Sequence, residues 1–240
     1  MKDKEILILT TRPLDEAVIE KAAFQQVVID TIPFIEINRC ISSEVSARIV
    51  DLSTQNATVV FTSVNAVEIV VDAIPTHLQM PAWNIYCIGG ATFTLIKKYW
   101  PFESVLSTAK NATGLAKKII EDGLTHIHFF CGNKRLEELP DLLKQQNIGV
   151  DELVVYSTVE TPAMINRTYD GILFFSPSAV NSFFSNNSPS KETTLFAIGH
   201  TTAEAIKQFS ANSIIVSDFP AKDQLVDKML RYYHEKKYKE

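Results

Sequence analysis

Two short motifs occur twice in this sequence of 240 residues, in the same order each time. FTSVNAV at Phe61–Val67 returns as FFSPSAV at Phe174–Val180, which lies 113 residues further along the chain. IGGAT at Ile88–Thr92 returns as IGHTT at Ile198–Thr202, with a spacing of 110 residues. Ordered matches at a long and nearly constant spacing indicate an internal duplication, whose copies are domains and not the short units of a solenoid.

Short apolar strands alternate with amphipathic helical segments along the chain. A strand at Ile6–Leu9 is followed by a hydroxyl-rich loop and a helical pattern, and a strand near Ile127–Phe130 begins the same plan again. Alternation of this kind is typical of parallel α/β layers, so we expect two similar parallel-sheet α/β domains. The apolar stripe predicted for the second helix consists of Leu136, Leu139 and Leu143.

Composition narrows the range of functions. Hydrophobic residues make up 46% of the chain, which is enough for a substantial core. The net charge of -5 argues against a nucleic-acid surface, because such a surface needs clustered lysine and arginine. No apolar run approaches the ~20 residues of a membrane span, and the first residues become polar too early for a signal peptide. We expect a cytoplasmic protein that binds neither nucleic acids nor membranes.

Motifs for metal binding or nucleophilic catalysis are missing from the sequence. It has no His-x-x-x-His pair, no Gly-x-Ser-x-Gly turn and no glycine-rich nucleotide fingerprint. The cysteines form no Cys-x-x-Cys pair, so we expect each of them to be a small buried residue. They are Cys40, Cys87 and Cys131. The residues therefore predict no metal site and give no support for a bound nucleotide.

Hydroxyl and glycine residues mark the places where predicted strands pass into helices. Ser63 and Ser176 occupy N-cap positions, although Asn65 with Glu68 can form a capping box instead. The unpaired N–H groups at such a helix start attract anions, and glycine lets a ligand approach closely. Capping and turn chemistry explains any single loop equally well. Its recurrence in two loops of each copy favours an anion-binding edge, with further contributions expected from Gly89, Gly90, Thr92, Gly199, Thr201 and Thr202.

Charged and aromatic residues at or near the ends of predicted strands are further candidates for the site. Arg12 follows the first strand, and Arg135 follows the corresponding strand of the other copy; both are equally consistent with solvated helix starts. His200 is the histidine placed to meet a ligand, whereas His126 and His128 flank a predicted strand and are expected to be structural. Tyr156 lies in an extended segment, where it has either a role in the site or a role in packing.

That segment, LVVYSTVETP at Leu153–Pro162, is equivalent by position to VIDTIPFIEIN at Val28–Asn38. Both are rich in β-forming residues and each contains or ends at a proline. We interpret them as paired connectors between the two domains, with Tyr156 near an interdomain cleft.

Seven motifs together resemble the uroporphyrinogen-III synthase family over about Ile6 to Leu230. They are TTRP, FTSVNAVE, CIGGAT, CGNKRLEELPDLL, VVYSTVETP, FFSPSAVNSFF and AIGHTTAEAI. The resemblance implies two α/β domains joined by a two-stranded β-ladder, with one domain formed by residues 1–32 plus 162–240 and the other by residues 33–161. It also implies cyclisation of hydroxymethylbilane to uroporphyrinogen III, with inversion of the terminal ring, loss of water and no cofactor.

The same resemblance makes Tyr156 the expected proton donor to the departing hydroxyl. His200 departs from the family pattern, where proline is common, and the net negative charge is unexpected for an enzyme with a polycarboxylate substrate. We expect a monomer. A phosphosugar isomerase and a non-enzymatic ligand sensor are the alternative functions. The predicted substrate-binding residues are Arg12, Ser63, Asn65, Ala66, Gly89, Thr92, Gly132, Arg135, Ser176, Ser178, Ala179, His200, Thr201 and Thr202.

Overall fold

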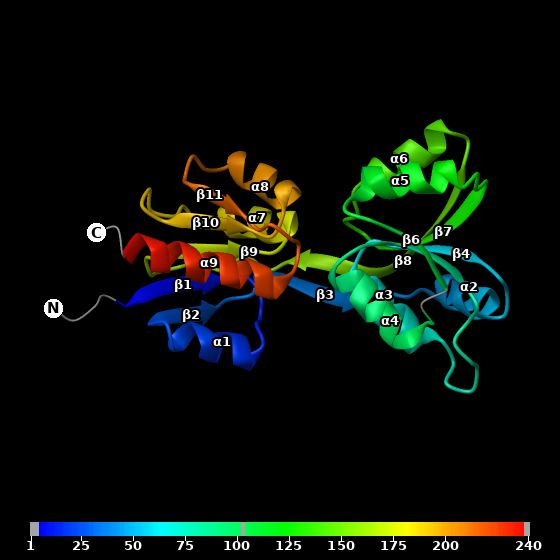
Figure 1. Ribbon diagram of the computed structural model, residues 1–240, viewed down its shortest axis with the longest axis horizontal. Helices are drawn as coiled ribbons and strands as arrows, with labels where there is room; N and C mark the ends of the chain where they lie inside the picture. Colours follow the sequence, from blue (N-terminus) through cyan, green and yellow to red (C-terminus); the bar gives the residue numbers. More distant parts are fainter. Residues whose placement is uncertain (1–4, 102–103, 238–240) are drawn as a thin grey trace. The chain divides into compact units, whose positions relative to one another are not determined.

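The computed structural model describes residues 5–101 and 104–237, and the chain forms two compact units (Figure 1). We call them the terminal unit, formed by Met1–Glu36 with Val159–Glu240, and the middle unit, formed by Ile37–Thr158. The chain therefore leaves the terminal unit once and returns to it once. Each unit has its own sheet and its own apolar clusters.

The sheet of the terminal unit consists, within the described residues, of five parallel strands. They are β1 (Ile6–Thr10), β2 (Val27–Thr31), β9 (Gly171–Phe174), β10 (Thr194–Ala197) and β11 (Ile214–Val216). Their order across the sheet is β11-β10-β9-β1-β2. Every residue of β9 and β10 is buried, as expected for central strands of a parallel sheet that is covered on both faces.

Helices cover both faces of this sheet. They are α1 (Glu16–Ala23), α7 (Pro177–Phe184), α8 (His200–Lys207) and α9 (Lys222–Lys237). Neighbouring residues of a strand point to opposite faces, and the apolar clusters follow this rule. Phe174 packs with residues of α7 and α8, whereas Leu173 packs with residues of α1 and α9.

The middle unit is built in the same way around a longer sheet. Its strands are β3 (Ile35–Arg39), β4 (Thr58–Phe61), β5 (Asn84–Ile88), β6 (Val105–Ala109), β7 (His126–Gly132) and β8 (Gly149–Glu160). Their order is β3-β8-β7-β4-β5-β6, and β4 to β8 pair in parallel. The helices are α2 (Ser43–Ser53), α3 (Val64–Ala73), α4 (Ala91–Tyr99), α5 (Ala112–Glu121) and α6 (Glu138–Gln145). Phe61 packs with residues of α2, α3 and α4 on one face, and Phe129 with residues of α5 and α6 on the other.

The two sheets share one topology, which confirms the predicted pair of similar parallel α/β domains. In β11-β10-β9-β1-β2 each strand corresponds by position to a strand of β6-β5-β4-β7-β8. The repeated FTS and FFS motifs lie at equivalent junctions, β4 to α3 and β9 to α7. In the terminal unit the β1-α1-β2 part comes first in the chain, whereas the corresponding β7-α6-β8 part of the middle unit comes last. The whole middle unit is inserted between β2 and β9.

The two predicted connectors contain a pair of strands, although Val28–Thr31 of the first connector belongs to β2 and pairs with β1 instead. β3 and β8 are neighbours in one sheet. The Cys40 N–H donates to the Val155 carbonyl at 3.0 Å. The Thr161 N–H donates to the Phe34 carbonyl, also at 3.0 Å. Partner numbers rise along one segment as they fall along the other, so this pairing is antiparallel. Pro33, which has no N–H to offer a sheet, lies in the break between β2 and β3.

Two predictions about apolar residues are wrong. Leu139 and Leu143 are buried as expected, but Leu136 is 52% exposed. The reason is that α6 begins only at Glu138, so Leu136 precedes the helix whose stripe it was expected to join. Cys40 is exposed, whereas the other two cysteines are buried.

Candidate active site

A serine caps α3 at the carboxyl end of β4. The Ser63 hydroxyl accepts a hydrogen bond from the Ala66 N–H at 3.1 Å, and the Ser63 backbone is extended as an N-cap requires. The alternative capping box is wrong, because Asn65 and Glu68 both lie inside the helix that begins at Val64. Ser63 therefore has a structural role as a cap, whatever else it does.

The terminal unit repeats this arrangement. Ser176 accepts a hydrogen bond from the Ala179 N–H at 3.2 Å, and Pro177 is the first residue of α7. A single cap satisfies only part of a helix start. Backbone N–H groups and the positive end of the helix dipole remain at both α3 and α7, where they favour a bound anion.

A tyrosine side chain reaches the Ser63 cap from β8. The Tyr156 hydroxyl donates to the Ser63 hydroxyl at 3.1 Å. Burial raises the pKa of Tyr156 above its usual value of 10.0, and hydrogen bonds with the Ser63 and Asn65 side chains lower this pKa only in part. The phenol therefore holds its proton throughout the physiological pH range. Since Ser63 accepts from both Ala66 and Tyr156, its own hydroxyl hydrogen is left to donate.

A register shift between β7 and β8 directs the Tyr156 side chain. Cys131 pairs with Val154, but the next residue, Gly132, pairs with Tyr156, so that Val155 is the extra residue of a bulge. Regular alternation places Val154 and Tyr156 on the same face. Because of the bulge, Tyr156 instead packs on the face covered by α3, together with Val155.

Comparison with known proteins identifies the family. The family model described as uroporphyrinogen-III synthase HemD matches residues 17–227. The chain belongs to the uroporphyrinogen-III synthase family. A mutant uroporphyrinogen III synthase from Thermus thermophilus has a similar crystal structure, with a TM-score of 0.66 and 15% identity over 98% of this chain and 100% of that one. Uroporphyrinogen-III synthetase from Helicobacter pylori gives a TM-score of 0.63 and 15% identity over 95% and 99% of the two chains. At this identity, the two structures show a shared fold.

Uroporphyrinogen-III synthases convert the linear tetrapyrrole hydroxymethylbilane into uroporphyrinogen III. The terminal pyrrole ring is inverted during closure and water is released, which makes the reaction a lyase step of tetrapyrrole biosynthesis. This is the activity of the present chain. Since the family match extends through residues of both units, it favours this synthase activity over a phosphosugar isomerase or a ligand sensor.

In each unit of the synthase, the predicted site residues gather at the carboxyl edge of the sheet. Those of the middle unit are Ser63, Asn65, Ala66, Gly89, Thr92, Gly132, Arg135 and Tyr156, and those of the terminal unit are Arg12, Ser176, Ser178, Ala179, His200, Thr201 and Thr202. They lie in the loops or first helical turns that follow β4, β5 and β7 or β1, β9 and β10, except for Gly132, the last residue of β7, and Tyr156 on β8. Parallel strands bring such segments to one edge of a sheet.

The hydroxyls of the glycine loops differ in accessibility. His200 and Thr201 are exposed at the start of α8. In contrast, Thr202 is 3% exposed and Thr92 is 5% exposed. A substrate therefore meets Thr201 more readily than Thr202, and the two buried threonines contribute first of all to packing. Gly90, with a φ of 76°, has the left-handed backbone that favours glycine.

The two arginines of the predicted synthase site are in contact with protein groups. Arg135 forms ion pairs with Glu152 and, at 3.4 Å, with Glu137. A substrate carboxylate has to compete with these partners, so the anion-binding role predicted for Arg135 is weakened by its surroundings. The Arg12 guanidinium lies 5.8 Å from the centre of the Phe175 ring in a cation–π contact and stays exposed to solvent.

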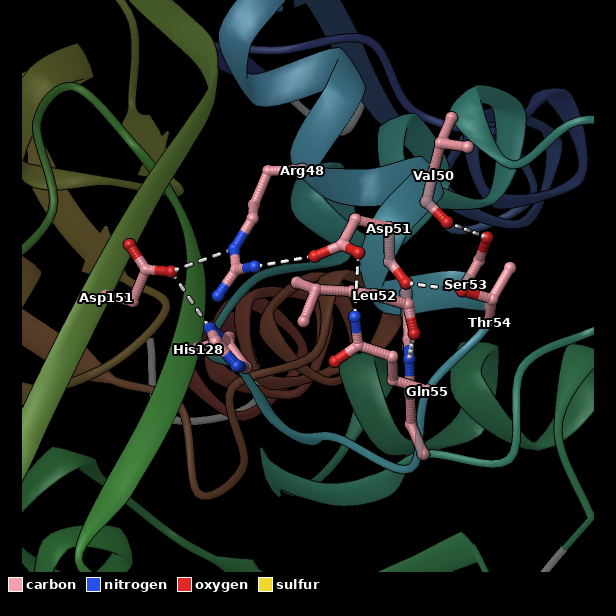
Figure 2. A network of polar contacts seen from close by, with 10 residues as sticks. Arg48, Val50, Asp51, Leu52, Ser53, Thr54, Gln55, His128 and Asp151 are labelled. Atoms are coloured by element: carbon pink, nitrogen blue, oxygen red, sulfur yellow. Dashed lines mark hydrogen bonds and ion pairs between the residues drawn. The ribbon is translucent and has the colours of Figure 1, made fainter.

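A polar network that the sequence does not reveal connects α2 with β7 and β8 (Figure 2). The Asp151 carboxylate accepts from Arg48 Nε at 3.3 Å and contacts His128 Nδ1 at 3.0 Å. His126 stacks edge-on against His128, with 4.8 Å between the ring centres. Both histidines lie within β7 and do not flank the strand as predicted; His128 is buried and His126 is exposed, and their structural role stays a prediction.

This network predicts acid sensitivity of the middle unit. Burial lowers the pKa of His128 below 6.5, although the hydrogen bond to Asp151 acts in the opposite direction. The unfolded chain therefore binds more protons than the folded one as pH falls below about 6.5, and stability is lost towards acid. We expect the free energy of unfolding in urea to fall between pH 7 and roughly 5.5, and to fall less in His128→Gln. His77→Gln, at an exposed histidine, is the control. Equal pH slopes for His128→Gln and the wild type would contradict this account.

Proposed function

We propose that Tyr156 protonates the hydroxyl that leaves hydroxymethylbilane when ring closure begins. The observation that carries this proposal is the hydrogen bond of 3.1 Å from the Tyr156 hydroxyl to Ser63 at the start of α3. Hydroxide is a poor leaving group, and a proton delivered as the bond breaks turns it into water. Because burial raises the pKa of Tyr156, its phenol is protonated at physiological pH and has a proton to give.

The remaining chemistry belongs to the substrate. Loss of water leaves an azafulvene cation that the electron-rich pyrroles stabilise, so the proposed reaction uses no cofactor and no metal. The substituted carbon of the terminal ring then attacks this cation, and the resulting spiro intermediate fragments and closes again with inversion of that ring. Loss of one ring proton gives the neutral product and returns a proton to the phenolate of Tyr156. The task of the protein is to hold the flexible chain in the conformation from which this attack is favoured.

Substrate carboxylates are bound in this proposal by the helix starts and hydroxyl loops of both units. Ser63 and Ser176 mark two such helix starts, and Thr201 supplies an exposed hydroxyl at a third. Their local positive potential outweighs the formal charge of -5 on the whole chain, because binding depends on the field near the loops. Arg12 adds a positive charge after β1.

Further parts of the proposal concern the setting of the enzyme. It acts as a cytoplasmic monomer and binds neither nucleic acids nor membranes. Over residues 5–101 and 104–237, no helix has the length and apolarity needed to cross a membrane. The domain boundaries are proposed at 32/33 and 161/162, in the connectors next to β3 and the end of β8.

A direct assay tests the proposed chemistry. The purified protein is incubated with freshly made hydroxymethylbilane, and the type I and type III isomers of the product are separated after oxidation. With the protein present we expect more type III isomer than type I isomer, whereas the reaction without enzyme gives type I. Formation of type I alone, at the uncatalysed rate, would overturn the proposal, because Tyr156 would then have no catalysed ring closure in which to act.

Serine replacements separate capping from substrate binding. Ser63→Ala and Ser176→Ala should each cost ~1 kcal/mol of stability through loss of the cap, and both should raise KM. Only Ser63→Ala should also lower kcat, because Ser63 contacts Tyr156. Ser42→Ala removes an equivalent cap, from α2, and should change stability alone. Steady-state kinetics with an unchanged KM in both site variants would limit these serines to capping.

A further inference from the structure

The end of β7 makes room for the Tyr156 ring. A Cβ atom added to Gly132 would lie 2.4 Å from Tyr156 Cε2, 2.5 Å from Cζ and 2.9 Å from the hydroxyl oxygen. Carbon atoms do not approach so closely, so any side chain at Gly132 displaces the phenol. Gly132 has no positive φ, and close approach of this ring is what requires glycine there.

The next residue, Asn133, holds the β8 backbone at the tyrosine and two residues after it. The Asn133 N–H donates to the Tyr156 carbonyl at 3.0 Å. Its side-chain Oδ1 accepts from the Thr158 N–H at 2.8 Å. Asn133 thereby extends the ladder between β7 and β8 beyond Gly132, the last residue of β7. Tyr156 lies between the bulge at Val155 on one side and this side-chain bond on the other.

We propose that Gly132 and Asn133 are positioning residues, which hold the Tyr156 hydroxyl at Ser63 for proton transfer. This inference rests on the proposed role of Tyr156 and adds the residues that place its hydroxyl. Gly132 was expected to bind substrate, and Asn133 was not among the predicted residues. In this proposal Gly132 defines where the ring lies, and Asn133 fixes the strand from which the ring projects.

Small displacements of the hydroxyl are enough to slow the reaction. A displacement of about 1 Å can cost on the order of 100-fold in rate when it moves a reacting group out of line. The methyl group of Gly132→Ala pushes the ring away, because all three close atoms belong to the end of the Tyr156 side chain. Asn133→Ala removes the bond to Thr158, whereas Asn133→Asp keeps an oxygen that can accept it.

The experiment is a double-mutant cycle with hydroxymethylbilane as substrate. Gly132→Ala should lower kcat ~10- to 100-fold, like Tyr156→Phe, with a smaller change in KM and more type I product. The double variant Gly132→Ala/Tyr156→Phe should be no slower than Tyr156→Phe within about twofold, because both changes remove one function. Asn133→Ala should lower kcat in the same way, and Asn133→Asp should restore most of it.

Two controls report the structural cost of such changes. In Gly149→Ala, at the start of β8, the new methyl group would lie 2.7 Å from the His126 ring. This ring on β7 then has to move, but at the opposite end of the β7–β8 pair from Tyr156. In Asn187→Ala an Oδ1 bond to the Ile165 N–H, also 2.8 Å long, is lost in the terminal unit, together with Nδ2 bonds to the Ala163 and Phe183 carbonyls. Both should keep the wild-type kcat and isomer ratio.

The outcomes separate this inference from the role of Tyr156 itself. If Tyr156→Phe is slow while Gly132→Ala and Asn133→Ala keep the wild-type kcat, the positioning inference is overturned and the proton-donor role stands. Fully additive losses in the double variant also overturn it, because the residues then act independently of the hydroxyl. If Tyr156→Phe has wild-type activity, both the donor role and the positioning inference fail.

Discussion

Replacement of Tyr156 by phenylalanine is expected to lower kcat by ~10- to 100-fold and to shift the product towards the type I isomer. General acid catalysis usually contributes ~100- to 10,000-fold, and the low end applies here for two reasons. A phenol is a weak acid, and burial raises the pKa of Tyr156 further. Water can also replace the phenol in part as the proton donor. Since the free bilane closes to type I by itself, a slower enzyme leaves more substrate to that route.

The phenylalanine variant isolates the hydroxyl because the buried ring remains. Tyr86→Phe is the matched control. It removes another tyrosine hydroxyl of the middle unit, on β5, which donates to Asp122 at 2.6 Å, and it should affect stability alone. The measurement is the initial rate together with the isomer ratio for purified, folded protein. Wild-type rate and pure type III product from Tyr156→Phe would leave positioning of the bilane as the only contribution of the protein.

Local patterns in the sequence predicted the features that depend on short-range contacts. Ser63 and Ser176 each bond an N–H three residues away, so the N-caps were visible in the motifs themselves. The apolar runs of β9 and β10 and the repeated motifs are likewise visible in short stretches of sequence, and they predicted two α/β copies. The start of α6 could not be placed from periodicity, which is why Leu136 was assigned to a stripe that it does not join.

Contacts across the sheet could not be predicted, because they depend on register. The Tyr156–Ser63 hydrogen bond joins residues 93 positions apart. Its formation needs a bulge at Val155 that no residue pattern announced. Glu152, the partner of Arg135, likewise lies far along the chain, on β8, and this ion pair occupies a side chain that was predicted to bind an anion. Only Gly132 and Asn133, in the CGN sequence at the end of the apolar strand β7, offered a local sign of close packing there.

Truncation of Phe61 is expected to be the most destabilising change next to the site. Phe61 ends β4 two residues before Ser63 and is completely buried. Its ring stacks on Phe130 of β7, with ring centres 5.3 Å apart and planes inclined by 19°. This pair therefore joins the strand ends that carry Ser63 and Gly132. Large-to-small changes of this kind cost ~3–5 kcal/mol, because burial is lost and a cavity is left.

The middle unit reports its own unfolding, since both tryptophans, Trp83 and Trp100, lie in it. A shift of the fluorescence transition in urea therefore measures the effect of Phe61→Ala on this unit, without assuming that both units unfold together. Phe61→Leu, which keeps more of the volume, should be clearly less destabilising. Leu106→Ala, at a 52% exposed position, should stay within about 0.5 kcal/mol of the wild type.

Since a domain is stable by only ~5–15 kcal/mol, Phe61→Ala should be partly unfolded under mild denaturing conditions. A cost below about 1 kcal/mol would show that the strand ends repack without the ring, and that the Phe61–Phe130 stack does not hold Ser63 and Gly132 in place.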